Sequence, residues 1–536
     1  MRAPPRPPRG RPFAPIGGVD FPDTILASHL FATGSTGVGK TEALMRLLEA
    51  ALVPYFRTLH LDTKQTELSV LRSILPKQRI ANLHPFDDDG LAWDIAADLD
   101  SPQAISDFVY SLIPENDAGG NARFFDSSSR SISDAQLDVF RFLTRSACER
   151  LLALGRSWDL RDLICSVSRE NLRPLLEQTD RGRRVIRNQL DNSGTSVDRE
   201  QDLIASLGSH LDRFIPIAGA LHHHNRKGRR FSINAWVAGL TPEICLRLAL
   251  DDQYEHSLHP LVGLMLRYII RRLFGRRVDL YRPEFFLFFD EVQALAKHVA
   301  DLPHFMATAR TKGCAVIATT QNFVTLRRSS GDPEAHQAFL DNAGVQVFFR
   351  TDSREVAEAA SRLCGQQEYL RMQPSLGDNE GEGLAITQGD TFTKTSTRGF
   401  IDHHNWPDTF EGSIASSWQN SHTPSRQRGR QSGIVITRQT QDLLPAHVFL
   451  NLERFSRERG VECFVRIANH KWLARLEPEW IAARSPRRVK IDSYPLDPDA
   501  TEFHPWTDEE REAFLGTGGA SGGGFFDHIG RGSSES

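Results

Sequence analysis

The stretch of the chain that decides its fold is Gly34-Ser35-Thr36-Gly37-Val38-Gly39-Lys40-Thr41. It matches the phosphate-binding loop pattern G-x-x-x-x-G-K-[ST] at every fixed position. The glycines let such a loop curl until its backbone N–H groups point at phosphate oxygens. Lys40 brings a positive charge to the β and γ phosphates, and the Thr41 hydroxyl is a ligand for Mg²⁺. The stretch therefore predicts a site for a nucleotide and Mg²⁺.

The segments on both sides of this loop fit the prediction. Residues 24–32 are predicted to form a strand, and residues 42–52 have the spacing of an amphipathic helix. Strand, loop and helix is the order that a phosphate-binding loop requires, and the helix adds the positive end of its dipole. Residues 56–62 follow as a second predicted buried strand.

The alternation of strands and helices resumes further along the chain. It returns with residues 231–237 and a helix near 258–274. Three more strands are predicted at 285–289, 315–320 and 345–349, and helices near 292–312 and 353–364 fill the crossovers. The first of these strands, Phe285-Phe-Leu-Phe-Phe289, is apolar throughout, which is typical of a central parallel strand covered on both faces.

We therefore predict an α/β fold, with a P-loop NTPase core of the RecA/ASCE type, a central mostly parallel sheet and an inserted, mostly α-helical subdomain. Residues 102–230 carry Leu, Arg, Asp and Ser at helical spacing, whereas residues 366–435 are polar and have no clear element boundaries. The predicted layout is a disordered, basic, Pro-rich arm at 1–20, the core at 21–101 and 231–480, the helical subdomain at 102–230, and a largely disordered C-terminal extension at 481–536.

Composition excludes several other classes of protein. The 536 residues are 40% hydrophobic and 25% charged, as in ordinary globular proteins. The six cysteines form no C-x-x-C pair, which argues against structural zinc, and the longest apolar run falls far short of the about 20 residues of a membrane span. With no secretory signal in the sequence, we expect a cytoplasmic protein.

An acidic pair supplies the other half of a phosphoryl-transfer site. Asp290 and Glu291 directly follow the apolar strand, as in a Walker B element, so Asp290 would hold Mg²⁺ and Glu291 would polarise the attacking water. Gln321 ends the next predicted strand, where it either senses the γ phosphate and the attacking water or only contacts solvent.

Three more residues have roles that the pattern leaves open. Arg310 precedes the strand that ends at Gln321, and it is either a surface residue or an arginine finger for a neighbouring subunit. Asp62 and Lys64, just past the second predicted strand, either line the nucleotide cleft or only form a turn.

Several of these segments together resemble the conjugative coupling proteins of type IV secretion, the VirD4/TraD/TraG group of the FtsK–HerA motor ATPases. The resemblance is carried by residues 33–41, 60–64, 286–292, 305–313, 318–322 and 342–349. It covers about 24–64 and 240–365. The all-α insertion of this family fits the helical region, whereas its usual N-terminal transmembrane helices have no counterpart in this sequence.

The resemblance implies a homo-hexameric ring that binds ATP and Mg²⁺ and moves DNA through its centre. It also implies that Lys40, Asp290, Glu291 and Gln321 act as argued above, with Arg310 as the finger. A relaxase, type IV secretion components and a membrane partner that holds the protein at the inner membrane are the further partners implied. The alternatives are a soluble HerA-like motor in DNA processing or defence, a nucleotide-gated adaptor, and a protein translocase.

DNA contact has to come from local patches, because the net charge is −4. Basic clusters lie at 181–187, 226–230, 271–277, 426–430 and 484–490. Each of them alone is more simply a solvated surface. The His222-His-His224 triplet has no partner ligands at fixed spacing, so we expect a solvent loop there rather than a metal site.

Overall fold

The computed structural model describes most of the chain. The described residues are 12–16, 19–22, 27–52, 56–113, 134–187, 197–276, 283–294, 302–379, 429–456, 458–467, 470–476 and 495–516. None of the helices in these ranges combines the length and the apolar character that a bilayer-crossing segment needs.

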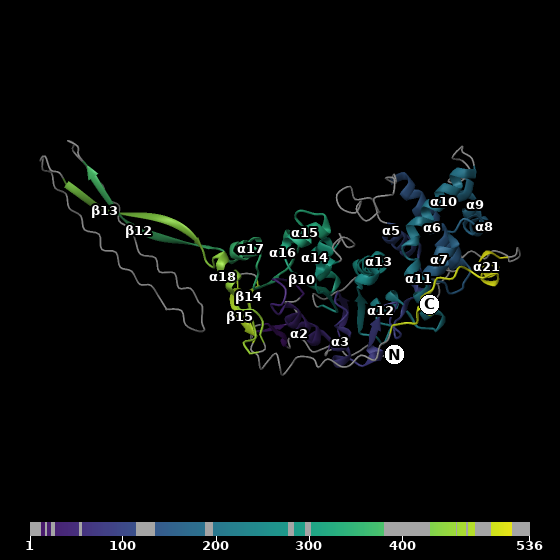
Figure 1. Ribbon diagram of the computed structural model, residues 1–536, viewed down its shortest axis with the longest axis horizontal. Coiled ribbons are helices and arrows are strands. Elements are labelled where there is room, and N and C mark those ends of the chain that lie inside the picture. The colour runs from purple at the N-terminus through teal and green to yellow at the C-terminus, as the bar shows by residue number, and fades with distance from the viewer. Residues whose placement is uncertain are drawn as a thin grey trace, which may run out of the picture.

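A nine-stranded sheet carries the phosphate loop (Figure 1). From one edge to the other its strands are β15 (His470–Leu476), β14 (Val461–Ile467), β11 (Val345–Phe349), β3 (Leu30–Thr33), β10 (Cys314–Thr320), β9 (Phe285–Phe289), β4 (Arg57–Asp62), β8 (Cys245–Ala249) and β5 (Ile80–Asn82). The strands from β11 to β5 are parallel, and β14 and β15 add an antiparallel edge. The mostly parallel α/β sheet is therefore confirmed.

Both faces of the sheet are covered, which explains the unbroken apolar run of β9. Phe286 and Phe288 face a core that includes the helices α2 (Lys40–Leu52) and α3 (Leu68–Ile74). Phe285, Leu287 and Phe289 face the opposite core, with α13 (Glu255–Phe274) and α14 (Leu302–Ala309). Successive side chains of a strand point to opposite faces, so a strand in the middle of such a sandwich has no polar position.

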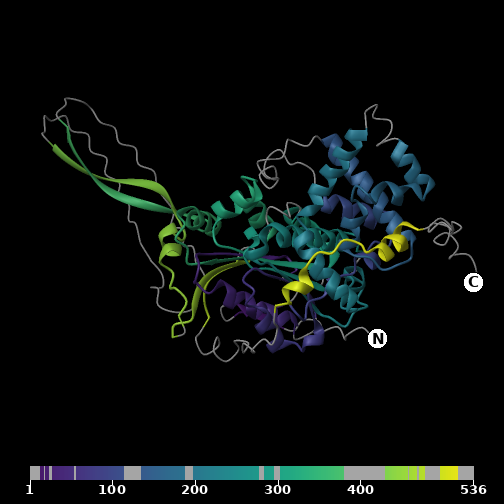
Figure 2. The ribbon, with the colours of Figure 1, turned by 45° about the vertical axis from the view of Figure 1, so that its right-hand side comes forward.

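The second core continues from the sheet into a helical subdomain. Its helices are α5 (Pro102–Leu112), α6 (Asp134–Ala153), α7 (Leu160–Ser166), α8 (Leu172–Glu177), α9 (Asp180–Val185), α10 (Val197–Asp212) and α11 (Ile215–Arg226). Figures 1 and 2 show them gathered at one end of the molecule. Helix α13 packs against α5 and α11, so it joins this subdomain to the sheet. The exact domain boundaries stay a prediction.

A long antiparallel ribbon leaves the opposite end of the molecule in both views. It pairs β12 (Gln366–Asn379) with β13 (Gly429–Asp442), residue by residue from Gln366 with Asp442 to Asn379 with Gly429. The polar composition of this region gave no strand signal. The ribbon forms through pairing between two strands that are far apart in the sequence.

Both ends of the chain contain more structure than we expect from the sequence. Residues Pro12–Ile16 (β1) and Val19–Pro22 (β2) pair as antiparallel strands beside α2, so the prediction of a disordered arm over 1–20 is wrong for the described part of it. Residues 495–516 contain α20 (Pro498–Thr501) and α21 (Asp508–Leu515), two helices that we did not expect within the extension at 481–536. Residues 1–11, 477–494 and 517–536 lie outside the described ranges.

Other predicted elements also differ from the structure. The strand expected over 24–32 begins only at Leu30, because Ala27 and Ser28 form a turn. Instead of a strand over 231–237, Ser232 caps the short helix α12 (Ile233–Val237) by accepting the N–H of Ala235. The helix expected near 292–312 consists of a 3₁₀ turn at Val292–Ala294, then α14 and a second 3₁₀ turn at Arg310–Lys312, and residues 295–301 lie outside the described ranges.

Candidate active site

The phosphate loop joins the end of β3 to the start of α2 and depends on glycine at two positions. Gly37 has a φ of 75° and Gly39 a φ of 93°, in the left-handed region where side chains are disfavoured. A Cβ on Gly39 would also lie 2.7 Å from Cγ2 of Val461 on β14. The loop therefore packs closely against β14, and its curled backbone can bind phosphate oxygens.

Lys40, the first residue of α2, folds back over this loop. Its ammonium donates to the carbonyl oxygens of Gly34 and, at 2.8 Å, of Ser35. Burial lowers the pKa of Lys40 to about 8, against the opposing effect of Glu291 and Asp290. A desolvated ammonium beside a glycine-lined loop binds phosphate strongly, because the charge of the anion replaces the solvation that the ammonium lost on burial.

The acidic pair lies beside the phosphate loop, as we expect from the sequence. Strand β10 lies between β3 and β9, and because all three are parallel, their C-terminal ends lie on the same side of the sheet. The Thr41 hydroxyl lies 3.3 Å from Oδ2 of Asp290, although 249 positions separate the two residues in the sequence. Asp290 is fully buried.

Glu291 is held in a strained backbone conformation by residues at the end of β10. Its φ is 60°, which is uncommon for a residue with a side chain and typical of functional sites. The N–H of Glu291 donates to Oγ1 of Thr319 at 3.0 Å, and the same hydroxyl donates to Oδ1 of Asp290 at 2.8 Å. The side-chain amide of Gln321 donates to Oε1 of Glu291 at 2.8 Å.

Two residues of this site were not assigned a role from the sequence. Thr319 was missed because a threonine inside an apolar strand carries no signal of its own. The sequence leaves Lys64 with either a role in the nucleotide cleft or a role in a turn, and the structure places its ammonium beside the acidic pair. Its ammonium contacts Oδ2 of Asp290 at 2.9 Å, Oγ1 of Thr41 at 3.2 Å and Oε1 of Glu291 at 3.4 Å.

The oxygens around Lys64 have the chemistry of a magnesium site. Mg²⁺ prefers carboxylate and hydroxyl oxygens together with substrate phosphates. Asp290 and Thr41 supply such oxygens, and a cationic ammonium already contacts both of them. The donor set therefore fits Mg²⁺, with Thr41 and Asp290 as the protein ligands.

Arg310 lies at the opposite end of the parallel strands, where β10 begins. It begins the 3₁₀ turn that precedes β10, whereas the phosphate loop, Gln321 and the acidic pair follow the far ends of their strands. The seven residues of β10 span roughly 20 Å, which separates the exposed Arg310 from the phosphate loop of its own chain. Any contact between Arg310 and a nucleotide would have to be with a neighbouring subunit.

Comparison with known proteins agrees with this geometry. The family described as the type IV secretion-system coupling protein DNA-binding domain matches residues 14–398, well over half of the chain. The chain belongs to this family. The coupling protein TraD of Escherichia coli (strain K12) is 23% identical to it over 347 residues, which are 63% of this chain and 44% of TraD. The chain thus spans less than half of the length of that relative.

Solved structures of a coupling protein share the fold. The unbound monoclinic form of the bacterial conjugative coupling protein TrwBdeltaN70 superposes with a TM-score of 0.59 at 17% identity, covering 89% of this chain and 91% of that chain. The plasmid coupling protein TrwB in complex with ADP and Mg²⁺ gives a TM-score of 0.58 at 17% identity, covering 89% and 92%. The RecA-like P-loop NTPase fold is therefore established for this member of the coupling-protein family.

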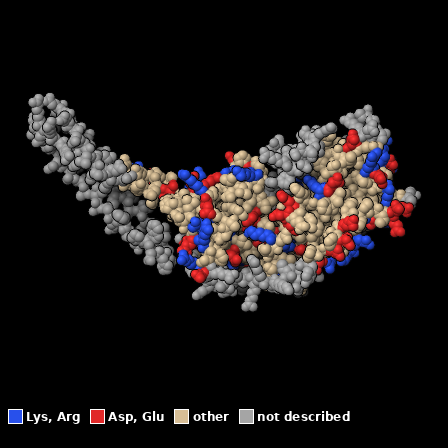
Figure 3. Space-filling view, viewed as in Figure 1, with Lys and Arg blue, Asp and Glu red and all other residues tan. Residues whose placement is uncertain are grey.

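The basic clusters of this coupling-family chain contribute less free charge than their sequence suggests. Arg271 pairs with Asp107, Arg276 with Glu284 and Arg183 with Asp180. In Figure 3 both signs of charge are interspersed over the visible face. The side chains of the clusters at 426–430 and 484–490 lie outside the described residues.

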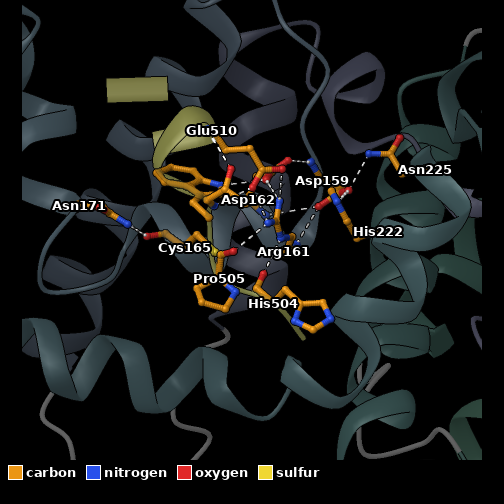
Figure 4. A network of polar contacts seen from close by, with 12 residues as sticks. Asp159, Arg161, Asp162, Cys165, Asn171, His222, Asn225, His504, Pro505 and Glu510 are labelled. Carbon is orange, nitrogen blue, oxygen red and sulfur yellow. Dashed lines mark hydrogen bonds and ion pairs between the residues drawn. The ribbon is translucent and has the colours of Figure 1, made fainter. Parts of the chain in front are cut away.

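The histidine triplet is part of a helix, not a solvent loop. His224 on α11 is buried and lies 2.9 Å from the carbonyl oxygen of Pro85. Nδ1 of His222 lies 2.8 Å from Oδ2 of Asp159, and Asp159, Asp162 and His222 together could surround a metal ion. Figure 4 shows instead that the two carboxylates are already engaged with protein donors.

These donors come from helix ends and from the C-terminal segment. Asp159 and Asp162 form the capping box at the start of α7, and Asp159 also accepts from Asn225. Asp162 accepts the indole N–H of Trp506 at 2.9 Å. The two carboxylates thus cap α7 and hold the C-terminal segment, which gives the cluster a structural role.

Proposed function

We propose that this chain is an ATP-hydrolysing DNA translocase of conjugative DNA transfer that works as a homo-hexameric ring. The observation that carries the proposal is the convergence of three strand ends. The phosphate loop follows β3, the acidic pair follows β9, and Gln321 follows the strand between them. The family match, which is to a DNA-binding domain of coupling proteins, supports DNA as the polymer that is moved.

The residues of the site divide the work of phosphoryl transfer to water. Thr41 and Asp290 would hold Mg²⁺, which would offset the charge of the ATP phosphates. Lys40 binds the β and γ phosphates together with the loop N–H groups. Glu291 accepts the proton of the attacking water, and the hydrogen bond from Gln321 fixes the direction in which its carboxylate points.

The surroundings of the ring follow from the same proposal. A relaxase and other type IV secretion components would deliver or receive the DNA, and a membrane partner would hold the cytoplasmic ring at the inner membrane. Each of these belongs to the proposal and needs its own binding experiment.

DNA-stimulated ATPase activity is the experiment that tests the proposed function. We expect single- or double-stranded DNA to raise ATP turnover of the wild-type protein several-fold or more, with the Glu291→Gln variant as the background. ATP turnover that DNA does not change would contradict a motor and favour a nucleotide-gated adaptor.

Mixed rings test the hexamer and the role of Arg310 together. Arg310 lies where β10 begins, whereas the phosphate loop follows the end of β3, so the two are at opposite ends of parallel strands. We therefore propose that Arg310 reaches the nucleotide of the neighbouring subunit. Arg310→Ala should therefore abolish activity alone but regain part of it when mixed with a Glu291→Gln subunit. Mixtures as inactive as the two variants separately would contradict action in trans.

A further inference from the structure

Lys64 occupies the part of the site where a metal ion would bind. Its ammonium contacts Thr41 and Asp290, the two residues whose oxygens fit Mg²⁺, and it also reaches Glu291. It therefore balances two carboxylates, of which Asp290 is fully buried.

The loop that carries Lys64 is built to hold it there. Asp62, the last residue of β4, accepts the backbone N–H of Lys64 on one carboxylate oxygen and that of Glu67 on the other, both at 3.2 Å. Gln65 between them has a φ of 55°, so the turn is kept in an unfavourable conformation.

The anchor of this loop is itself a buried ion pair. Two nitrogens of Arg247 on β8 donate to Oδ2 of Asp62 at 2.8 and 3.0 Å. Burial acts to raise the pKa of Asp62, but Arg247 and His60 together with the hydrogen bonds to the carboxylate lower it. A surface turn with no further role would not need a buried ion pair, two backbone anchors and a strained residue.

We propose that Lys64 is an exchangeable counter-cation of the magnesium site, which neutralises Asp290 and Glu291 without the metal and must leave Asp290 when Mg²⁺ binds. The inference rests on the proposed function, since it assumes that Thr41 and Asp290 bind Mg²⁺ together with ATP. Its physical basis is charge repulsion. An ammonium and a divalent ion that both contact Oδ2 of Asp290 and the Thr41 hydroxyl repel each other, so the metal binds more tightly once Lys64 has moved away.

Exchange has two measurable consequences in a Lys64→Met variant, which keeps a long side chain and removes the charge. The first is a lower demand for Mg²⁺, because the metal no longer displaces a competing cation. We expect the Mg²⁺ concentration for half-maximal binding of a fluorescent, non-hydrolysable ATP analogue to fall roughly three- to tenfold. The second is lower thermal stability in EDTA, because Asp290 then lacks its cation, with a difference from wild type that shrinks when Mg²⁺ alone is added.

The control variants are Lys64→Arg and Lys227→Met. The arginine keeps a cation in the loop and should keep the wild-type Mg²⁺ demand. Lys227 is exposed just after α11, away from the phosphate loop, and its substitution should change neither quantity.

The two readouts separate the possible failures. If wild type binds the analogue but Lys64→Met needs as much Mg²⁺ as wild type, or more, the exchange is contradicted and the proposed function stands. A melting difference that Mg²⁺ alone does not reduce also contradicts the exchange. If wild type shows no Mg²⁺-dependent analogue binding, the proposed function fails and the inference fails with it.

Discussion

Among the described residues, a cluster of buried acids and cations in the helical subdomain differs from the one beside the phosphate loop in how completely its charges are engaged. In the helical subdomain, Arg161 is buried and donates to the carbonyl oxygens of His504 and Pro505 and to both carboxylate oxygens of Glu510. Figure 4 shows Arg161 among Glu510, His504 and Pro505 of the C-terminal segment. At the sheet edge, Lys64 is 40% exposed, and the only partners described for its ammonium are the three candidate site residues.

Backbone strain also separates the two regions. Glu291 and Gln65 adopt left-handed conformations at the sheet edge, whereas the residues of the helical network have ordinary capped-helix geometry. A fully engaged network holds the C-terminal segment on the subdomain. A strained, partly exposed one can exchange its partners. The comparison therefore indicates that the network in the helical subdomain stabilises the fold, whereas the cluster around Lys64 and Glu291 serves catalysis.

Removing Lys40 should give the largest effect on function. Lys40→Ala loses the charge-assisted hydrogen bonds to the phosphates, so we expect ATP affinity to fall roughly 10³-fold, measured by titration with a fluorescent analogue. Asp162→Asn in the helical network is the matched control and should leave the affinity unchanged. If Asp162→Asn weakened ATP binding as much as Lys40→Ala, the helical network would also support nucleotide binding, and the two regions would not be functionally separate.

Removing Arg161 should give the opposite pattern. Arg161→Ala removes the ion pair with Glu510 and leaves two carbonyl oxygens without their donor, and we expect the free energy of unfolding to fall by about 2 to 3 kcal/mol. Urea unfolding measures this loss. ATP affinity per folded molecule should not change, and a loss of affinity would show that the C-terminal segment supports the nucleotide site.

The sequence allowed the segments of the candidate site to be located because their signals are local, and the roles of their residues stay a prediction. The phosphate loop and the acid-tipped strand of Phe285–Phe289 are each contiguous, and parallel strands bring their ends together without further information. Features that depend on pairing were not predictable. Strand β8 was missed because Arg247 interrupts its apolar pattern, and the buried charge is acceptable because Asp62 on the neighbouring strand β4 neutralises it and Asn82 accepts a further hydrogen bond.

The C-terminal segment was missed for a similar reason. Its residues are polar and rich in turn formers, and their order comes from Trp506 and Glu510, which meet α7 more than 300 positions earlier in the chain. Gly219 on α11 allows this approach, since a Cβ there would lie 2.3 Å from the carbonyl oxygen of Thr501. The ribbon β12–β13 likewise joins strands separated by a long intervening segment.

A smaller effect is expected from Gln321. Gln321→Ala removes the hydrogen bond that directs Glu291, so ATP turnover should fall about tenfold while the nucleotide affinity and the melting temperature stay near wild type. Steady-state kinetics measure this change. An unaltered turnover number would mean that Thr319 and the backbone position Glu291 without help.

The smallest effect is the pH dependence of the helical network. The hydrogen bond from Arg161 lowers the pKa of Glu510 to about 2, so its stabilisation is present above pH 4.5 and is lost as the pH falls towards 2. Burial and the nearby Asp159 raise the pKa of Asp162 to about 6, so protonation of Asp162 stabilises the fold as the pH falls from 6 to 4.

Urea unfolding of wild type at pH 7, 5 and 3 measures both effects when it is compared with two variants. The stability difference between wild type and Glu510→Gln should shrink at pH 3, and the difference between wild type and Asp162→Asn should change between pH 7 and 5. Parallel pH profiles for all three proteins would contradict these assignments.

The central claim is that Glu291 is the base of an ATP-hydrolysing site formed with Lys40 and Asp290. Glu291→Gln tests it most directly, with Mg²⁺-ATP binding and ATP turnover measured on the same preparation. We predict binding within a few-fold of wild type and turnover lowered by roughly 10²- to 10⁴-fold. Normal turnover by this variant would contradict the claim.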